Sequence, residues 1–200
     1  MNRQVLVNGL AVMALLGAMS ACGSDDEPKA ASTTTATTPV ATTPAPTSPT
    51  QPQGSDGVTI TIGNWEQHAE DPAVLAYSKL IEGIGASGNA GKIVPALRDV
   101  ASKKVLRLYA PGLQQQWDND WRVDEQGDAK ILSSRASGST TRIVACLWAP
   151  TTDFKDKSGK LINNQKAEWH KQRATVSVAG GTAKVTTISQ KGTCSGGEPA

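Results

Sequence analysis

The apolar stretch that ends at Cys22 constrains this chain more than any other feature. Val5 to Met19 is an apolar run broken only by Asn8 and small residues, it follows a single positive charge at Arg3, and small residues lead into the cysteine. A basic start, a short apolar run and small residues before a cut are typical of a secretory signal peptide, and the run is too short for a spanning helix. We therefore expect residues 1–21 to be removed and the remainder to fold outside the cytoplasm.

Met19-Ser20-Ala21-Cys22 resembles the lipobox of bacterial lipoproteins. In that family the cysteine thiol receives a diacylglyceryl group, the signal is cleaved before the cysteine, and the new amine is acylated. The resemblance implies that Cys22 is lipidated with palmitate-type chains. At about 0.8 kcal/mol per buried methylene, two or three chains would hold the protein firmly in the membrane. The expected location is the extracytoplasmic face of the cell membrane.

The segment after Cys22 has no core-forming pattern. Residues 33–52 are a mixture of Thr, Pro, Ala and Ser. Such a segment buries too little apolar area to offset the entropy of ordering, so residues 22–56 are expected to be the lipidated cysteine and a disordered tether. Residues 57–200 would then be one domain, in line with roughly 100–200 residues per domain.

The charge and the cysteine content further restrict the kinds of partner and site that the domain is expected to have. The net charge is +2 and the charged residues are interspersed, which does not favour a nucleic-acid partner. Cys146 and Cys194 form an even pair in an oxidising compartment, so we expect a disulfide that closes a loop of about 49 residues and contributes on the order of 4 kcal/mol. The alternative is a metal site, but these cysteines with His68 and His170 lack zinc-like spacing. No metal and no cofactor are expected.

Helix signals fill the first half of the domain. Asp71 followed by Pro72 predicts a helix start, and the apolar spacing continues to a stop at Gly85–Gly88. Pro95 opens a second predicted helix. Ser102 caps a third, whose buried side would comprise Val105, Leu106, Leu108 and Tyr109, and which Pro111-Gly112 would interrupt.

Strand signals fill the second half, after a turn expected at Gln126–Asp128. In residues 166–178 the apolar positions change parity between Trp169 and Ala174, which indicates either a bulge near 171–173 or a sheet with core on both faces. Helices followed by an antiparallel meander predict an α+β fold. The expected strands are 129–136, 141–148, 166–178 and 182–190, while the alternation in residues 58–62 fits either a short strand or an extended lead-in.

The pattern also resembles that of actinobacterial-type lipoproteins whose exported domain has the nuclear-transport-factor-2-like (NTF2-like) fold. The residues that carry the resemblance are the helix segments 71–77 and 97–102, Ile143-Val144-Ala145-Cys146 and Gly192-Thr193-Cys194. The resemblance implies a cone, in which N-terminal helices close the wide end of a curved antiparallel sheet around a pocket.

Two sets of residues are candidates for a site in that pocket. Aromatic walls suit apolar or sugar ligands, although core packing explains aromatic residues equally well. The pocket candidates are Tyr109, Trp117, Trp121, Trp148 and Trp169. Relatives of the fold use an Asp or an Asp/His pair, for which this chain offers Asp99, Asp118, Asp120 and His170. No spacing among these fixes a dyad, and His170 shares a strand face with Glu168 and Gln172, which predicts solvent exposure. No catalytic residue is therefore assigned.

The expected function is that of a lipid-anchored, non-enzymatic binding or assembly module. Its partner would be another envelope protein, a cell-wall component or a second copy of the chain. Two alternatives remain open: a carrier of a small apolar ligand, and an isomerase- or dehydratase-like enzyme.

Overall fold

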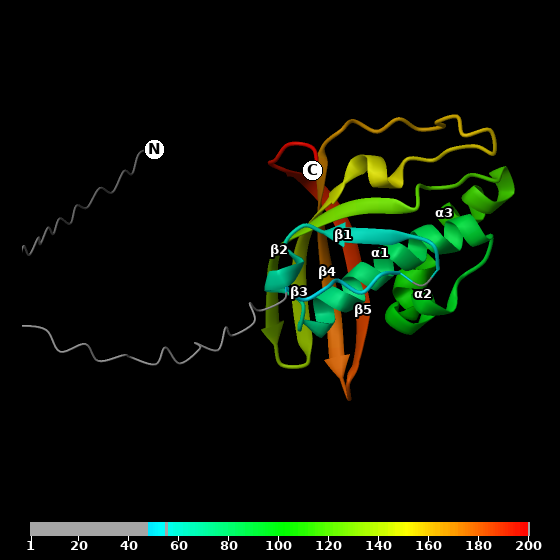
Figure 1. The fold of residues 1–200 in the computed structure, drawn as a ribbon. Helices are drawn as coiled ribbons and strands as arrows, with labels where there is room; N and C mark the ends of the chain where they lie inside the picture. The colour runs from blue at the N-terminus through cyan, green and yellow to red at the C-terminus, as the bar shows by residue number, and fades with distance from the viewer. Residues whose placement is uncertain (1–47, 55, 200) are drawn as a thin grey trace, which may run out of the picture. The chain divides into compact units, whose positions relative to one another are not determined.

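A short strand comes first along the chain, three helices follow, and a run of four long strands completes the domain (Figure 1). The computed structural model describes residues 48–54 and 56–199. The expected signal peptide, the Cys22 lipidation site and most of the tether lie outside the described residues. The helices and strands are β1 (Thr59–Ile62), η1 (Trp65–Gln67), α1 (Pro72–Ala90), α2 (Pro95–Val100), α3 (Lys103–Asn119), β2 (Gln126–Ser137), β3 (Thr140–Trp148), η2 (Ala149–Thr152), β4 (Trp169–Ala179) and β5 (Thr182–Cys194).

The strands form one five-stranded sheet in the order β1-β2-β3-β4-β5. β2 to β5 are an antiparallel meander, as expected, but β1 pairs with β2 in parallel. The expectation of a wholly antiparallel sheet is therefore wrong. Parallel neighbours need a long crossover connection, and here the three helices provide it. The α+β class is confirmed, with a mixed sheet, and none of the described helices is long and apolar enough to cross a membrane.

Both predicted helix caps are present. The Asp71 carboxylate accepts hydrogen bonds from the backbone N–H groups of Ala73 and Val74, and Pro72 occupies the first helical position, where no N–H is needed. The Ser102 hydroxyl accepts from the N–H of Val105 at the start of α3.

Both predicted helix interruptions are wrong. α1 continues through Gly85 and Gly88 and ends at Ala90, where Gly91 has a left-handed φ of 67°. α3 continues through Pro111 to Asn119 because Val105 and Leu113, before and after the proline, are both buried in the core. Leu108, predicted on the buried side of this helix, is 60% exposed. Tertiary packing has outweighed the local breaker signal in both helices.

The turn predicted at Gln126–Asp128 is also wrong, because these residues begin β2 and pair with β1. Gly127 serves close packing and not a turn. A Cβ added there would lie 2.1 Å from Cγ2 of Thr151 and 2.9 Å from Cδ1 of Ile60, so no larger residue fits without a shift.

The sheet has apolar clusters on both faces. The inner cluster, against the helices, includes Ile143 and Leu147 of β3 and Val176 of β4, whereas the outer cluster consists of Cys146, Trp148 and Trp169 with Cys194 packed beside them. The β3–β4 register is regular, so the change of parity in β4 reflects core on both faces. The β4–β5 register shifts at two places, near Gly192, whose φ is 80°, and near Thr186, and in both the extra residue lies on β5.

The described part of the predicted tether contacts the domain. The side-chain amide of Gln51 donates to the carbonyl oxygen of Ile60 and accepts from the N–H of Ile62, so it satisfies backbone groups on the free edge of β1. On the same strand, the N–H of Ile60 donates to the buried Glu82 carboxylate at 3.1 Å. Contacts of the folded domain therefore begin before residue 57.

Candidate ligand-binding cavity

A cavity of about 230 Å³ lies between helices α1 and α3 and the inner face of the sheet. Its wall is mostly apolar, and none of the residues that line it is Asp, Glu, Lys, Arg or His. Because no charged side chain is available as a partner, a charged ligand group buried here would pay an uncompensated desolvation cost. The lining residues are Val58, Ile60, Ile81, Ile84, Gly85, Tyr109, Gly112, Leu113, Gln116, Val123, Leu147, Thr151, Thr152, Phe154, Gln172 and Gln190.

Four elements position the polar part of this wall. Tyr109 and Gln116 come from α3, Gln172 from β4, Gln190 from β5, and Thr151 and Thr152 from η2. Burial raises the pKa of the Tyr109 phenol, so its hydroxyl keeps the proton near neutral pH and remains a donor. Thr152 also lines the cavity, but its hydroxyl already donates to Ala149 O and accepts from the Gln165 amide.

Gln172 is held from the core side by Tyr77 of α1. The Tyr77 hydroxyl donates to Oε1 of Gln172 at 2.7 Å, and both side chains are buried. Burial also raises the pKa of the Tyr77 phenol, so this hydroxyl stays protonated. The contact joins the first helix directly to a central strand.

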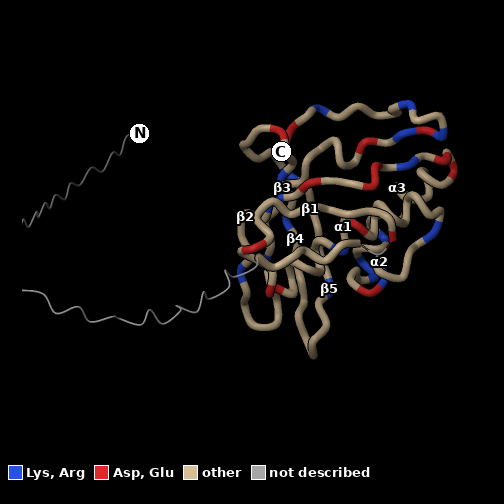
Figure 2. The backbone as a smooth tube through the Cα atoms, viewed as in Figure 1, with Lys and Arg blue, Asp and Glu red and all other residues tan. Residues whose placement is uncertain are grey.

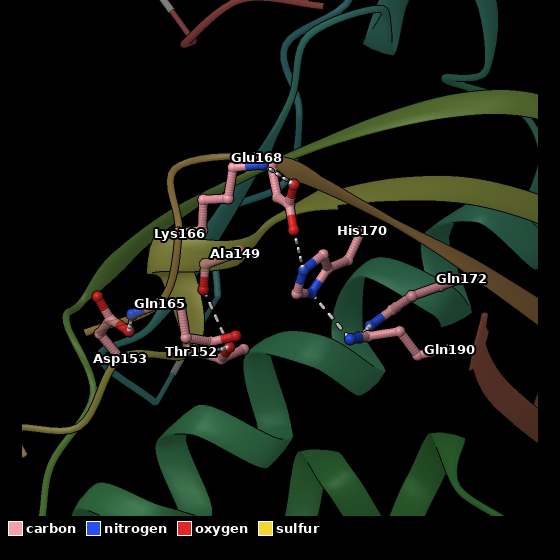
Figure 3. A network of polar contacts seen from close by, with 9 residues as sticks. All are labelled: Ala149, Thr152, Asp153, Gln165, Lys166, Glu168, His170, Gln172 and Gln190. Atoms are coloured by element: carbon pink, nitrogen blue, oxygen red, sulfur yellow. Dashed lines mark hydrogen bonds and ion pairs between the residues drawn. The ribbon is translucent and has the colours of Figure 1, made fainter. Parts of the chain in front are cut away.

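From Gln172 the polar contacts continue to the surface (Figure 3). Nε2 of Gln172 lies 3.3 Å from Oε1 of Gln190, and Nε2 of Gln190 lies 2.8 Å from Nδ1 of His170. Nε2 of His170 is 3.4 Å from Glu168, whose carboxylate also pairs with Lys166 at 3.0 Å. The hydrogen bond from Lys166 is the main cause that lowers the pKa of Glu168. A row of hydrogen bonds, continued by two ion pairs at Glu168, thus links the buried end of the cavity to solvent.

His170 is not placed as predicted. The strand face that it shares with Gln172 is the inner face, because their β3 partners Leu147 and Ala145 belong to the inner cluster. Gln172 is 5% exposed and His170 is half-buried. The expected exposure of this face is therefore wrong, since a polar residue on it is accommodated by hydrogen bonds and not by solvent.

Among the predicted aromatic residues, Tyr109 lines the cavity and the four tryptophans do not. Trp148 and Trp169 lie in the outer cluster, on the other face of the sheet, with ring centroids 5.2 Å apart. Trp117 donates from Nε1 to Ser87 O and so joins α3 to α1, while Trp121 stacks on Phe154 at 5.7 Å. These four tryptophans therefore have the packing role that was the alternative to lining a pocket.

The outer cluster surrounds the predicted disulfide, which is confirmed: Cys146 of β3 is bonded to Cys194 at the end of β5. Nε1 of Trp169 donates to Gly197 O at 2.7 Å, and Nζ of Lys130 lies 4.2 Å above the same ring. The C-terminal residues and the lysine together cover this tryptophan, which is 1% exposed.

The aspartates weighed as catalytic acids lie away from the cavity wall. Asp118 accepts from the Gln114 amide on the same helix, and Asp120 ends α3 in an ion pair with Arg122. Asp99 borders a different depression beside α2, together with the buried Glu82. His170 approaches the cavity through its contact with Gln190.

Charged residues gather instead on the loops, as Figure 2 shows for the segments around residues 120–128 and 153–160. Both signs occur there, with Lys155 paired to Asp124. Within residues 48–54 and 56–199, no group of three or more His, Cys, Asp or Glu side chains could hold a metal ion.

Sequence reasoning missed Tyr77, Gln172 and Gln190 as site residues. A signal for Gln172 was present, because it has the parity of Ala174 and Val176 and so occupies a core position in the strand pattern. A polar residue at such a position needs buried partners. Nothing local marks Tyr77 or Gln190 as those partners, since they lie on α1 and β5, far from Gln172 in sequence.

Comparison with known proteins identifies no family for this chain. No protein-family model matches it, and no curated protein matches it. Among solved structures, the intermembrane space region of the chloroplast protein ARC6 matches with 15% sequence identity and a TM-score of 0.36, over 59% of this chain and 95% of that chain. At that TM-score the likeness carries no inference about the fold family or the function of this protein.

Proposed function

We propose that this protein binds a small, largely apolar ligand in the cavity between α1, α3 and the sheet, without catalysing a reaction on it. The single observation that carries the proposal is the cavity itself: about 230 Å³, mostly apolar, with a few polar groups from α3, β4, β5 and η2. Small-molecule sites have this character. A cavity of about 150 Å³ holds benzene, so this one has room for roughly ten non-hydrogen atoms.

The absence of catalysis is proposed from the same wall. General acid–base chemistry needs a titratable group within hydrogen-bond reach of the reacting atoms. The lining residues include a phenol, amides and hydroxyls, and they include no carboxyl or imidazole group. Burial raises the pKa of the Tyr109 phenol, so this group stays protonated near neutral pH and the phenolate that could act as a base is not populated.

The setting proposed for this domain combines the NTF2-like cone with a lipid anchor. A meander whose inner face is covered by N-terminal helices, with a cavity between them, supports the cone. The lipobox-like residues up to Cys22, and a disulfide suited to an oxidising compartment, support anchoring at the extracytoplasmic face of the membrane. The ligand would then be carried or sensed at the cell envelope.

Ligand binding is preferred over the assembly module because the described surface favours no protein-docking area. The exposed large apolar side chains lie on separate elements: Leu108 on α3, Leu132 on β2, and Leu161 and Ile162 in the loop before β4. Apolar side chains scattered in this way are ordinary on a protein surface.

Native mass spectrometry tests the proposal. The chain is exported by its own host with Cys22→Ser, which removes the thiol expected to carry lipid, and native and denatured masses are compared. We expect additional mass in the native spectrum alone. Leu147→Trp, which fills the cavity, should abolish that mass, whereas Leu132→Trp on the exposed face of β2 should retain it. A bare chain in every sample, together with no binding of the hydrocarbon probe used below, would refute the proposal.

The anchor is tested separately by the mass of the N-terminal peptide from wild-type membranes. A diacylglyceryl or triacylated Cys22 is expected, and Cys22→Ser should appear in the medium or the soluble envelope fraction. An unmodified wild-type peptide would contradict the lipid anchor and leave the ligand proposal untouched.

A further inference from the structure

The row of hydrogen bonds beside the cavity has a fixed direction at its buried end. The Tyr77 hydroxyl lies 2.7 Å from Gln172, and no other acceptor for its proton occurs among its hydrogen bonds in the described residues. If Tyr77 accepted instead of donating, its own O–H would remain unpaired in the core, at a substantial cost. Tyr77 is therefore the donor and Oε1 of Gln172 the acceptor, which turns the Gln172 amide nitrogen toward Gln190.

The exposed end of the row is compatible with the same direction. The Glu168 carboxylate only accepts, and in the His170 tautomer that carries its hydrogen on Nε2, facing this carboxylate, Nδ1 is an acceptor. Nδ1 must then receive a hydrogen from Nε2 of Gln190, which places Oε1 of Gln190 toward Gln172. Both ends are thus compatible with one orientation of the two amides.

This orientation leaves the cavity with an unused donor. Each glutamine NH₂ group has two hydrogens, and each uses one of them within the row. Gln172 is buried and lines the cavity, and its second hydrogen has no acceptor among the described residues, whereas Gln190 is exposed and its second hydrogen is open to solvent. Oε1 of Gln172 is engaged by Tyr77, so the unpaired group of this side chain is an N–H group.

We infer that the ligand is neutral and carries a hydrogen-bond acceptor, such as the carbonyl of a ketone, ester or amide, directed at the side-chain N–H of Gln172. Its apolar remainder would lie against Ile81, Leu113 and Phe154. The absence of charged residues from the wall excludes a carboxylate or an ammonium group as the preferred head. This inference rests on the proposed function, since it names the chemical class of the ligand for the same cavity.

The test uses probes of equal heavy-atom count. Acetophenone carries a neutral acceptor, cumene replaces the carbonyl oxygen with a methyl group, and benzoate and protonated 1-phenylethylamine add an anion and a cation. Each is titrated into the oxidised Cys22→Ser chain labelled with ¹⁵N, and binding is followed through the side-chain amide signals of Gln172. Acetophenone should shift these signals downfield, and cumene should bind without that shift.

The affinity ratio of acetophenone to cumene is then compared between variants, because differences in the hydration of the two probes cancel in that comparison. Gln172→Leu should lower the ratio about three- to tenfold, the worth of one hydrogen bond. Tyr77→Phe lies outside the wall and removes only the group that orients the amide, so it should lower the ratio while Gln172 remains. Gln115→Leu, exposed on α3, is the matched control and should leave the ratio unchanged.

Tyr77→Phe combined with Gln172→Leu provides a second route if either single variant fails to fold, since it leaves neither partner unpaired. An unchanged ratio in this double variant, or tighter binding of benzoate or the amine than of acetophenone, would overturn the inference. If cumene binds and the ratio of acetophenone to cumene affinity does not depend on Gln172, the proposed ligand class is refuted, while the proposal that the cavity binds a ligand stands. Failure of all four probes counts against the cavity itself.

Discussion

The hydroxyl of Tyr77 in α1 donates a 2.7 Å hydrogen bond to Oε1 of Gln172 in β4, and the two side chains are 0% and 5% exposed. This pair is one of two buried polar contacts between α1 and the sheet described above, the other being that of Glu82 with Ile60, in an interface that is mostly apolar. A buried polar pair contributes little net stability when complete and costs much when one partner is lost. Its effect here is to fix which side of the Gln172 amide faces the cavity.

The first prediction follows from the difference between removing one partner of this buried pair and removing both. Tyr77→Phe should lower the free energy of unfolding by about 1–3 kcal/mol, because Oε1 of Gln172 loses its buried donor. Gln172→Leu should cost a similar amount, because the Tyr77 hydroxyl is left unpaired. The double variant should lose less than the sum of the two, with a coupling of about 0.5–3 kcal/mol in urea unfolding. Strict additivity would show that the hydrogen bond is not formed in solution.

The sequence predicted the helix starts and not the helix ends, for a physical reason. Asp71 and Ser102 act on neighbouring backbone N–H groups, so their effect is visible locally. The glycines predicted to end α1 pack against other elements instead: a Cβ at Gly88 would lie 2.2 Å from Oε1 of Gln116 in α3. A glycine required by close helix packing is indistinguishable in sequence from a glycine that ends a helix.

The cavity was only partly predictable for the same reason. Tyr109 was identified from its aromatic character, while Trp148 and Trp169 shared that character and lie on the opposite face. Alternation within one strand gives two faces without saying which face meets the helices. The alternation of residues along the strand places Gln172 on the same face as Ala174 and so indicates a core position. Its partners Tyr77 and Gln190 lie on other elements and reach it only in the folded protein.

Two glycines in helices give a matched pair for the second prediction. Gly83→Ala should destabilise the protein by about 1–3 kcal/mol, since the added Cβ would lie 3.0 Å from the backbone Cα of Leu97 and α2 must move. Gly112→Ala in α3 should stabilise it by up to about 1 kcal/mol, because a Cβ there meets nothing within 4 Å and alanine favours the helix. Thermal unfolding of both variants tests this, and shifts of the same sign would contradict it.

The third prediction concerns the disulfide, which joins residues 48 apart in sequence. Replacing Cys146 and Cys194 together with alanine should cost roughly 4 kcal/mol, as expected for a loop of this length in the chain-entropy model. Urea unfolding with and without reductant measures the effect. Reductant should destabilise the wild type and leave the double variant unchanged; a wild type insensitive to full reduction would argue against it.

The fourth prediction follows from Glu82, which is 5% exposed in α1 and accepts a hydrogen bond from the N–H of Ile60. Burial raises the pKa of this carboxyl above its usual 4.5, against smaller lowering effects from Ile60, Ser78 and Lys79. The folded state therefore holds the proton more tightly than the unfolded chain. The stability that this group contributes is fully present below the unfolded pKa and is lost as the pH rises through the folded pKa.

Glu82→Gln removes this titration and keeps a carbonyl oxygen for Ile60. The difference in the free energy of unfolding between Glu82→Gln and the wild type should thus shift in favour of the variant as the pH rises from about 4 to 7. Urea unfolding across this series measures the difference, with Glu66→Gln on the exposed side of η1 as the reference for removing one surface charge. A difference that moves toward the wild type with rising pH would contradict the prediction, because it would mean that Ile60, Ser78 and Lys79 favour the Glu82 carboxylate more than burial disfavours it.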